Sequence, residues 1–201
     1  MLSRLILLIA LLFPVYLSGQ TNWQLVKNRE GIKIYTSKST NSNFKRVKAS
    51  SVCQGTIDRA IRVFRNVAGQ PNWVYSTKRA CIIRQSTEND ILYYVESALP
   101  WPLSNRYLLA RMKIQPDLEN KQVLIYTTAD TSEQFSSGDG KIRITYFKVT
   151  WQIKQIDAKM ISIEYFLDID PGGNLPASVV NLFISQGPYK TLLKLAELLR
   201  K

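Results

Sequence analysis

The chain has 201 residues, of which 45% are hydrophobic, and it carries a formal net charge of +12 without a single histidine. This length fits one domain that buries a substantial core and still has room for an internal cavity. The absence of histidine excludes histidine acid/base catalysis, Ser-His and Cys-His nucleophiles and the usual imidazole metal sites. Because no other catalytic motif is recognisable, we expect a protein that is not an enzyme and that needs no cofactor or metal ion.

Residues 1–19 have the composition of a secretory signal peptide. One positive charge precedes an apolar run from Leu5 to Val15, and two small residues follow it. The run is too short and too lightly flanked for a spanning helix, and an uncleaved N-terminal anchor is the alternative. We predict cleavage near Gly19 and an exported domain, periplasmic or secreted, over residues 20–201.

The mature chain is strongly basic. Without Arg4 it has 26 Lys and Arg residues against 15 Asp and Glu, which leaves a net charge of +11. Such a chain is attracted to anionic surfaces, so an anionic membrane is a candidate partner. The basic residues form no dense run, and most of them are interpreted as an ordinary solvated surface. We expect no nucleic acid partner for an exported protein, and we expect a monomer.

The mature chain begins with a short segment at 23–26, for which we expect one helical turn, and continues into two strands. The residues at 32–38, after Gly31, and those at 44–53 follow strand patterns, with apolar and polar side chains alternating most clearly in the second. A polar turn at 39–43 joins the two segments. This arrangement predicts a β-hairpin.

A helix is predicted directly after this hairpin, over residues 57–68, because apolar side chains recur there at helical spacing. Thr56 is a suitable N-cap, and Asp58 suits the positive end of the helix dipole. A Gly-Gln-Pro sequence ends the helix. Trp73 follows, either as a plug of the core, which we favour, or as part of a pocket wall.

Strand patterns dominate the chain from residue 78 onward. They fall at residues 78–85, 91–99, 106–114, 122–129, 141–156 and 160–169, with turn-rich segments between most of them. Short connections of this kind imply an antiparallel meander. In the segment 141–156 the apolar residues change from even to odd positions, which predicts a bulge or bend near Tyr146.

The last and largest apolar element is a helix that follows the glycine and proline corner at 170–176 and runs to the C-terminus. Its polar stripe changes side at Gly187-Pro188, so we expect a kink or a restart there, with Val179 to Ile184 facing inward. Together the elements predict an α+β fold. A strongly curved antiparallel sheet of about eight strands would wrap around the terminal helix and leave a cavity between them.

Cys53 and Cys81 are the only two cysteines, and both lie in strand patterns. Export would permit a disulfide between them. We favour the interpretation that they are two separate, small, buried thiols.

Two segments resemble one known family. PWPLSNRYLLAR, at residues 100–111, resembles the P-x-P-x-S-N-R-D segment of START domains, the steroidogenic-acute-regulatory-related lipid-transfer domains. DPGGNLPASVVN, at residues 170–181, resembles the D-P-G-G-x-I-P-x-W-L-x-N segment that opens their terminal helix. The resemblance covers residues 23–201. It implies a helix-grip fold whose sheet and C-terminal helix enclose a hydrophobic tunnel for one lipid, with the helix and nearby loops as a lid.

A lipid site needs an apolar lining and a few polar groups that meet the head group. The aromatic candidates for the lining, each of which is equally explained as an ordinary core residue, are Tyr94, Tyr126, Trp151, Tyr165 and Phe183. Glu96 and Arg111 resemble a charged pair that some relatives keep inside the tunnel; its role is either head-group contact or structural, and we favour the latter for Glu96. Arg106, at a loop beside Trp101, either binds a phosphate or anchors the loop through backbone carbonyls.

The resemblance also implies lipid binding, since many family members bind or carry lipids and are not enzymes. We therefore predict a protein that holds one hydrophobic ligand in an internal tunnel, with or without transfer between membranes. One alternative is an envelope protein-interaction module without bound lipid, which a filled or collapsed cavity would favour. The other is a helix-grip enzyme, a cyclase or hydrolase, whose chemistry Tyr, Arg and Glu would have to supply.

Overall fold

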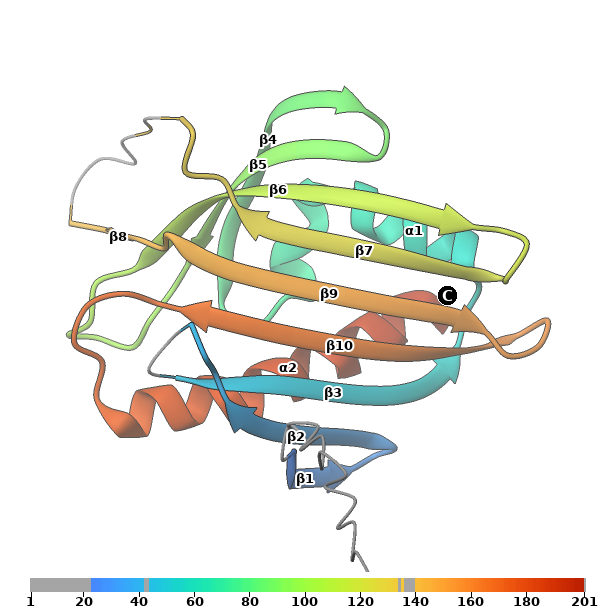
Figure 1. Ribbon diagram of the computed structural model, residues 1–201, viewed down its shortest axis with the longest axis horizontal. Coiled ribbons are helices and arrows are strands. Elements are labelled where there is room, and N and C mark those ends of the chain that lie inside the picture. The colour runs from blue at the N-terminus through green and yellow to red at the C-terminus, as the bar shows by residue number, and fades with distance from the viewer. Residues whose placement is uncertain (1–22, 42–43, 134, 136–139, 201) are drawn as a thin grey trace, which may run out of the picture.

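The structure is a computed structural model that describes residues 23–41, 44–133, 135 and 140–200. The elements of this part of the chain are β1 (Gln24–Arg29), β2 (Ile32–Lys38), β3 (Lys45–Gln54), α1 (Ile57–Arg65), the 3-10 helix η1 (Val67–Asn72), β4 (Thr77–Thr87), β5 (Asp90–Ser97), β6 (Arg106–Asp117), β7 (Gln122–Ala129), β8 (Ile142–Arg143), β9 (Tyr146–Gln155), β10 (Met160–Asp170) and α2 (Ala177–Arg200). In Figure 1 the large sheet faces the viewer, and α1 and α2 lie behind it. The signal peptide predicted at residues 1–19 lies outside the described residues.

The strands form one sheet in the order β1-β2-β3-β10-β9-β7-β6-β5-β4, and neighbours on this path are antiparallel. From β4 to β10 the chain follows the predicted meander, with β8 as a short branch parallel to β6. The sheet is completed where β10 pairs with β3, with Tyr165 opposite Ala49. This pairing brings the β2-β3 hairpin beside the last strand, although six strands separate them along the chain. The predicted α+β fold is confirmed.

The first described segment is a strand instead of the helical turn that its sequence predicts. β1 pairs with β2, with Leu25 opposite Tyr35, and a bulge lies between Leu25 and Lys27. Five of its six side chains are exposed, so no packing favours a helix, whereas pairing with β2 satisfies part of its backbone. The expectation of a helical turn at 23–26 is therefore wrong.

Helix α1 begins as predicted. The hydroxyl of Thr56 accepts a hydrogen bond from the backbone N–H of Arg59 (3.3 Å), which caps the first turn. The apolar face of the helix is buried through Ile57, Ala60, Ile61 and Phe64. The α-helix ends at Arg65, earlier than expected, and the chain continues as η1, whose first turn is capped by the side chain of Asn66.

The long strand pattern at 141–156 is divided in two where its parity changes. β8 ends at Arg143 and β9 begins at Tyr146, so the bend predicted near Tyr146 is confirmed. Between them the N–H of Ile144 donates to the carbonyl of Tyr107 (2.8 Å), which keeps the bend attached to β6. The change of parity allows side chains before and after the bend to face the same side of the sheet.

Helix α2 is continuous from Ala177 to Arg200 with Pro188 inside it. A restart at Gly187-Pro188 is therefore wrong, and the alternative of a kink stays a prediction. The buried side chains of Tyr189, Leu192 and Leu195 explain the continuity. Their burial, worth about 1.5 to 3 kcal/mol each, outweighs the roughly 3 kcal/mol that an interior proline costs. Neither α2 nor any other described helix has the length and apolar character to cross a membrane.

The C-terminal half of α2 is fixed to the core. Gly55, in the turn between β3 and α1, has a φ of +155°, and a Cβ added to it would lie 3.1 Å from the Cβ of Leu199. Glycine permits this close approach because it has no side chain. The end of α2 is thus held against that turn, and the opposite half of the helix, nearer Ala177, is left to cover the space under the sheet.

Cys53 and Cys81 are free and half-buried. Cys53 lies on β3 and Cys81 on β4, and five strands of the sheet lie between those two. Adjacent strands are about 4.8 Å apart, so the two thiols are far beyond the reach of a disulfide. Of the favoured interpretation, the separation of the two thiols is confirmed, whereas their full burial is not.

Candidate functional site

A cavity of about 220 Å³ lies between the sheet and the helices. Alternate residues of four strands line it: Tyr93 and Val95 on β5, Leu108, Ala110 and Met112 on β6, Phe147, Val149 and Trp151 on β9, and Tyr165, Leu167 and Ile169 on β10. Because side chains of a strand alternate between its two faces, one face of each strand forms the wall. The predicted cavity between sheet and helix is therefore present, and its strand walls are mostly apolar.

The helical elements complete the enclosure. Their lining residues are Phe64 of α1, Gln70 of η1, Trp73 after it, and Val180, Ile184, Gly187, Pro188 and Thr191 of α2. The predicted inward face of residues 179–184 is thus found at Val180 and Ile184. The side chain of Phe183, which was predicted to bind ligand, lies outside the described part of the structure.

Trp151 and Tyr165, two of the predicted lining residues, meet in the cavity wall. They are cross-strand partners on β9 and β10, with ring centroids 4.4 Å apart. Trp151 also packs edge-on against Phe64 (5.1 Å) and Trp73 (6.0 Å). Trp73 is only 2% exposed and also lines the cavity. It therefore plugs the core, as favoured, and forms part of the pocket wall as well.

Arg106 joins the two sequence motifs to each other. Its guanidinium donates from Nε to the carbonyl of Pro171 (3.1 Å), from Nη2 to that of Gly172 (2.9 Å), and from Nη1 to that of Ser104. Arg106 is 2% exposed and lines one end of the cavity, and burial lowers its pKa from the ordinary value. Of the two predicted roles, the structure contains the anchoring of the loop through backbone carbonyls.

Tyr94 and Glu96 lie on the other face of β5, away from the cavity. Glu96 accepts a hydrogen bond from Asn105 (2.9 Å) and pairs with Lys141 (3.0 Å) and Lys78 (3.4 Å). Burial by itself would raise the pKa of Glu96, but the hydrogen bonds and charges of these partners lower it. The network fits the structural role favoured for Glu96, and it corrects the expected placement of Glu96 and Tyr94 in the tunnel.

Arg111 and Tyr126 also lie outside the cavity wall. Arg111 pairs with Asp90 (3.2 Å) and Asp130 (3.3 Å), so the charged pair expected with Glu96 is replaced by other partners. Tyr126 is 36% exposed on the outer face of β7. The structure therefore brings Arg106, Trp151 and Tyr165 together at the cavity and places Tyr94, Glu96, Arg111 and Tyr126 elsewhere.

Two lining residues that the sequence did not indicate are neighbours of predicted ones. Tyr93 and Thr127 line the cavity, and each is one position from a predicted tyrosine. A shift of one residue moves a side chain to the other face of a strand, and the segment ILYYV is apolar on both faces. The sequence of β6 did contain a usable signal. Arg111 and Lys113, the two cations in the interior of this strand, both occupy odd positions and so indicate that the odd positions form the outer face.

Apart from Lys45 and Arg106, the described hydrogen-bonding side chains in the apolar wall of the cavity are neutral. Burial raises the pKa of Tyr93 and, alone, that of Tyr165, so both phenols stay protonated. Among the described residues, no group of three or more His, Cys, Asp or Glu side chains could hold a metal ion. The site is therefore built to enclose an apolar molecule and to orient a small number of its polar atoms.

A curved antiparallel sheet that closes around a long C-terminal helix and encloses an apolar cavity defines the helix-grip class of folds. The chain belongs to the START domain family, which its sequence matches over residues 11–200. The resemblance indicated by the two motifs is thereby confirmed.

Individual relatives are distant but cover most of the chain. Human phosphatidylcholine transfer protein is 22% identical over 169 residues, which are 83% of this chain and 78% of that protein. An uncharacterized protein of Pseudomonas aeruginosa is 22% identical over 171 residues, 85% of this chain and 83% of that one.

Solved structures confirm the helix-grip fold. The STAR-related lipid transfer protein fragment from Xanthomonas axonopodis matches with a TM-score of 0.79 at 23% identity, covering 89% of this chain and 99% of that one. Human StAR-related lipid transfer protein 5 matches with a TM-score of 0.77 at 14% identity, covering 91% of this chain and 88% of that one.

Proposed function

We propose that the protein binds a single hydrophobic ligand, a lipid, in the cavity between the sheet and α2. The observation that carries this proposal is the cavity itself, about 220 Å³ of space with a mostly apolar lining. Apolar side chains that border an empty space lack the dispersion contacts that a filled core provides. A hydrophobic molecule would restore those contacts and leave water.

The family relationship supports transfer of this ligand between membranes. Human phosphatidylcholine transfer protein and the protein from Xanthomonas axonopodis are both named for lipid transfer. By analogy, the present chain would take its ligand from one membrane and release it at another. Transfer needs a surface that meets the membrane and a wall that opens.

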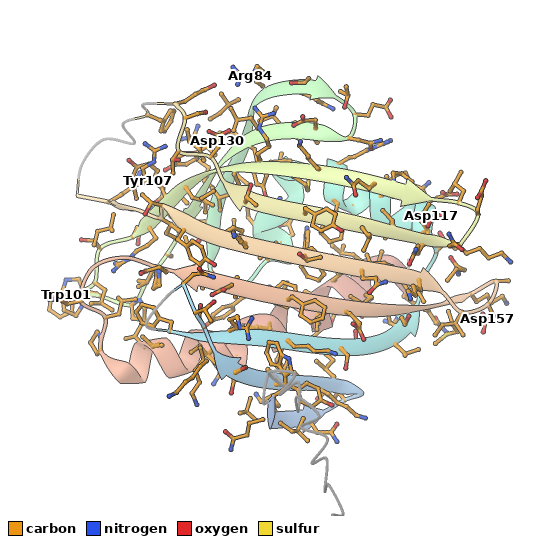
Figure 2. All side chains as sticks on the ribbon, in the orientation of Figure 1. Arg84, Trp101, Tyr107, Asp117, Asp130 and Asp157 are labelled. Carbon is orange, nitrogen blue, oxygen red and sulfur yellow. The ribbon has the colours of Figure 1, made fainter. Side chains whose placement is uncertain are left out.

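Trp101 supplies a candidate membrane contact. It is 91% exposed in the loop between β5 and β6 and lies at the end of the molecule where α2 begins (Figure 2). Tryptophan favours the interface between water and lipid, and the net charge of +11 on the mature chain attracts it to anionic membranes. Arg106 bonds this loop to the corner at Pro171 and Gly172, so a membrane that displaces the loop would also pull on the start of α2.

The direct test is native mass spectrometry of the mature chain purified from cells, followed by identification of any bound molecule. We expect a complex of one protein with one lipid, and uptake of lipid from liposomes by the delipidated protein. A protein that carries no extractable lipid and takes up none from liposomes would contradict the proposal.

A matched pair of variants ties the bound lipid to the cavity. Val149 lines the cavity, whereas Thr150, the next residue of β9, lies on the outer face. Val149→Phe should occupy part of the space and lower lipid occupancy, and Thr150→Phe should leave it unchanged. Equal occupancy in both variants would mean that the lipid binds elsewhere.

The two alternative functions receive less support. A protein-interaction module would be favoured by a filled cavity, and this cavity is open. An enzyme would need ionisable groups beside its substrate, and among the described lining residues only Lys45 and Arg106 carry a charge. Turnover of a hydrophobic substrate that Arg106→Gln abolishes, with binding retained, would support the enzyme over the binding protein.

We also propose that the chain is exported after cleavage near Gly19. The apolar run from Leu5 to Val15 behind a single arginine supports this. The intact mass of the protein recovered from its native envelope or medium should correspond to a chain that begins near Gln20. A recovered chain that begins at Met1 would favour the uncleaved anchor instead.

A further inference from the structure

The polar side chains deep in the cavity wall are uncharged. Gln70, Tyr93 and Thr127 come from three different elements, η1, β5 and β7, and each is 5% exposed and lines the cavity. Burial raises the pKa of Tyr93, and side-chain hydrogen bonding with Gln70 and Thr127 lowers it by a smaller amount. The three side chains form a neutral polar cluster inside an otherwise apolar wall.

Two further lining residues carry polar atoms without a partner. The indole Nε1 of Trp73 and the hydroxyl Oγ1 of Thr77 are buried and make no hydrogen bond within the described part of the protein. Both residues line the cavity, as does Gln70, which is three positions before Trp73. A buried polar atom without a partner is unfavourable, but a ligand in the cavity does not reach either of these two atoms, because the surrounding side chains cover both of them.

Positive charge, in contrast, is confined to two lining residues among those that the structure describes. Arg106 already gives its N–H groups to the carbonyls of Ser104, Pro171 and Gly172. Lys45, at the start of β3, is exposed to solvent. A phosphate or carboxylate drawn into the cavity would lose its hydration without gaining a partner of opposite charge, which is strongly unfavourable.

The volume of the cavity points in the same direction. About 220 Å³ lies below the usual range for pockets that enclose drug-sized molecules, roughly 300 to 1,000 Å³. A lipid with two long acyl chains would require a large expansion. A molecule with one chain or one compact ring system requires much less.

We propose that the ligand is an uncharged lipid with a single apolar body, whose hydroxyl or carbonyl oxygen is bound by Gln70, Tyr93 and Thr127. This inference rests on the proposed function, because it names the class of ligand for the same cavity. The neutral cluster binds the polar atom and thereby orients the ligand, while the aromatic wall around Trp151 encloses the apolar body.

Two pairs of probes separate charge from size. Oleyl alcohol and oleate have the same chain and differ in charge, and dioleoylglycerol and dioleoylphosphatidylcholine have the same two chains and differ in head group. Binding is followed by the fluorescence of the tryptophans in the wall and by native mass spectrometry. We expect oleyl alcohol to bind more tightly than the other three probes, and at least tenfold more tightly than oleate.

The outcomes distinguish this inference from the function on which it rests. Equal or tighter binding of oleate or dioleoylphosphatidylcholine would overturn the uncharged ligand and leave lipid binding intact. Binding of none of the four probes, with no lipid recovered from cells, would overturn both.

A second experiment tests the polar cluster with a matched control. Thr127→Val removes a hydroxyl from the cavity wall, whereas Thr128→Val removes one from the exposed outer face of the same strand. Loss of one hydrogen bond should weaken the binding of oleyl alcohol by about two- to tenfold. The affinity for octadecene, which lacks the hydroxyl, should stay unchanged. Equal effects of Thr127→Val on oleyl alcohol and octadecene, or equal effects of the two variants, would overturn the role of the cluster.

Discussion

Strands β5 and β6 bury apolar side chains on both of their faces, yet only one of the two faces borders a cavity. On the inner face Tyr93, Val95, Leu108 and Ala110 border the cavity. On the outer face a second, smaller cluster of buried residues lies against the segment that follows β7. Its members are Leu92, Tyr94, Tyr107 and Leu109, with Cys81 packed beside them.

The outer face is filled by the protein's own chain. The ring of Phe135 lies 5.4 Å from that of Tyr94 and 6.4 Å from that of Tyr107, and its carbonyl accepts a hydrogen bond from Tyr107 (3.2 Å). Arg143 holds the same segment through the carbonyls of Asp130 (3.1 Å) and Glu133 (2.9 Å). Figure 2 shows Tyr107 and Asp130 at this end of the sheet. Apolar side chains are therefore buried on both faces, but only the face that the chain leaves unfilled can take a ligand.

The largest effect that separates the two faces is expected at two arginines of β6. Arg106→Met should lower the free energy of unfolding by about 3 to 5 kcal/mol, because buried carbonyls lose a charged donor. Arg111→Met on the outer face should cost about 1 kcal/mol, since the ion pairs of Arg111 with Asp90 and Asp130 are partly exposed. Urea unfolding measures both values. Equal losses would contradict the anchoring role of Arg106.

Two adjacent leucines on β6 face opposite sides of the sheet. Leu109 is buried in the outer cluster and borders no cavity among the described residues, whereas Leu108 borders the cavity and so lacks partner atoms on one side. Leu109→Ala should cost about 3 to 4 kcal/mol and Leu108→Ala about 2 kcal/mol, within the range known for leucine truncation. Thermal and urea unfolding of both variants provide the test. A larger loss for Leu108→Ala would mean that the cavity is filled by protein in solution.

A smaller effect is expected from Glu96, whose partners all lie outside the cavity. Its folded pKa is lowered below the ordinary value of 4.5, so its contribution to stability is fully present above pH 4.5 and is lost as the pH falls through the folded pKa. Glu96→Gln should therefore cost about 1 kcal/mol at pH 7. The difference from the unmodified protein should narrow below pH 4.5, and ligand affinity should stay unchanged. A stability difference between Glu96→Gln and the unmodified protein that stays constant across this pH range would mean that the charge of Glu96 does not stabilise the fold.

The smallest effect is expected at the two cysteines, which belong to opposite faces. Cys53 packs against the main core and Cys81 against the outer cluster. Burial raises the pKa of the Cys53 thiol, which slows its reaction with thiol reagents. Mild oxidation should leave the mass and melting temperature of the monomer unchanged, and two thiols should react after unfolding. A mass lower by two hydrogens would reveal a disulfide that this sheet order does not allow.

Local features of the sequence predicted the elements well. The cap at Thr56, the hairpin before it and the parity change near Tyr146 depend on a few neighbouring residues, and each is found where expected. The motifs at 100–111 and 170–181 indicated the family, and Arg106 joins these two segments in space. Where local reasoning was wrong, as at β1 and at Pro188, pairing or packing with distant residues overrode the local preference.

The candidate site was predicted less completely. The sequence identified α2 as a large apolar element, and Trp151 and Tyr165 as candidates for the lining of the cavity. It indicated Tyr94 where the structure has Tyr93, because both residues are equally suited to a buried strand.

The family, the succession of strands and helices, and the presence of an apolar interior could thus be predicted from the sequence alone. The choice of the face that borders the cavity needed the tertiary structure in β5, whose segment ILYYV is apolar on both faces. That choice depends on the pairing of β3 with β10 and on the chain around Phe135 that fills the outer face. Both involve residues far apart along the chain, whereas the alternation of side chains in a strand has a period of two and is the same whichever face is left open.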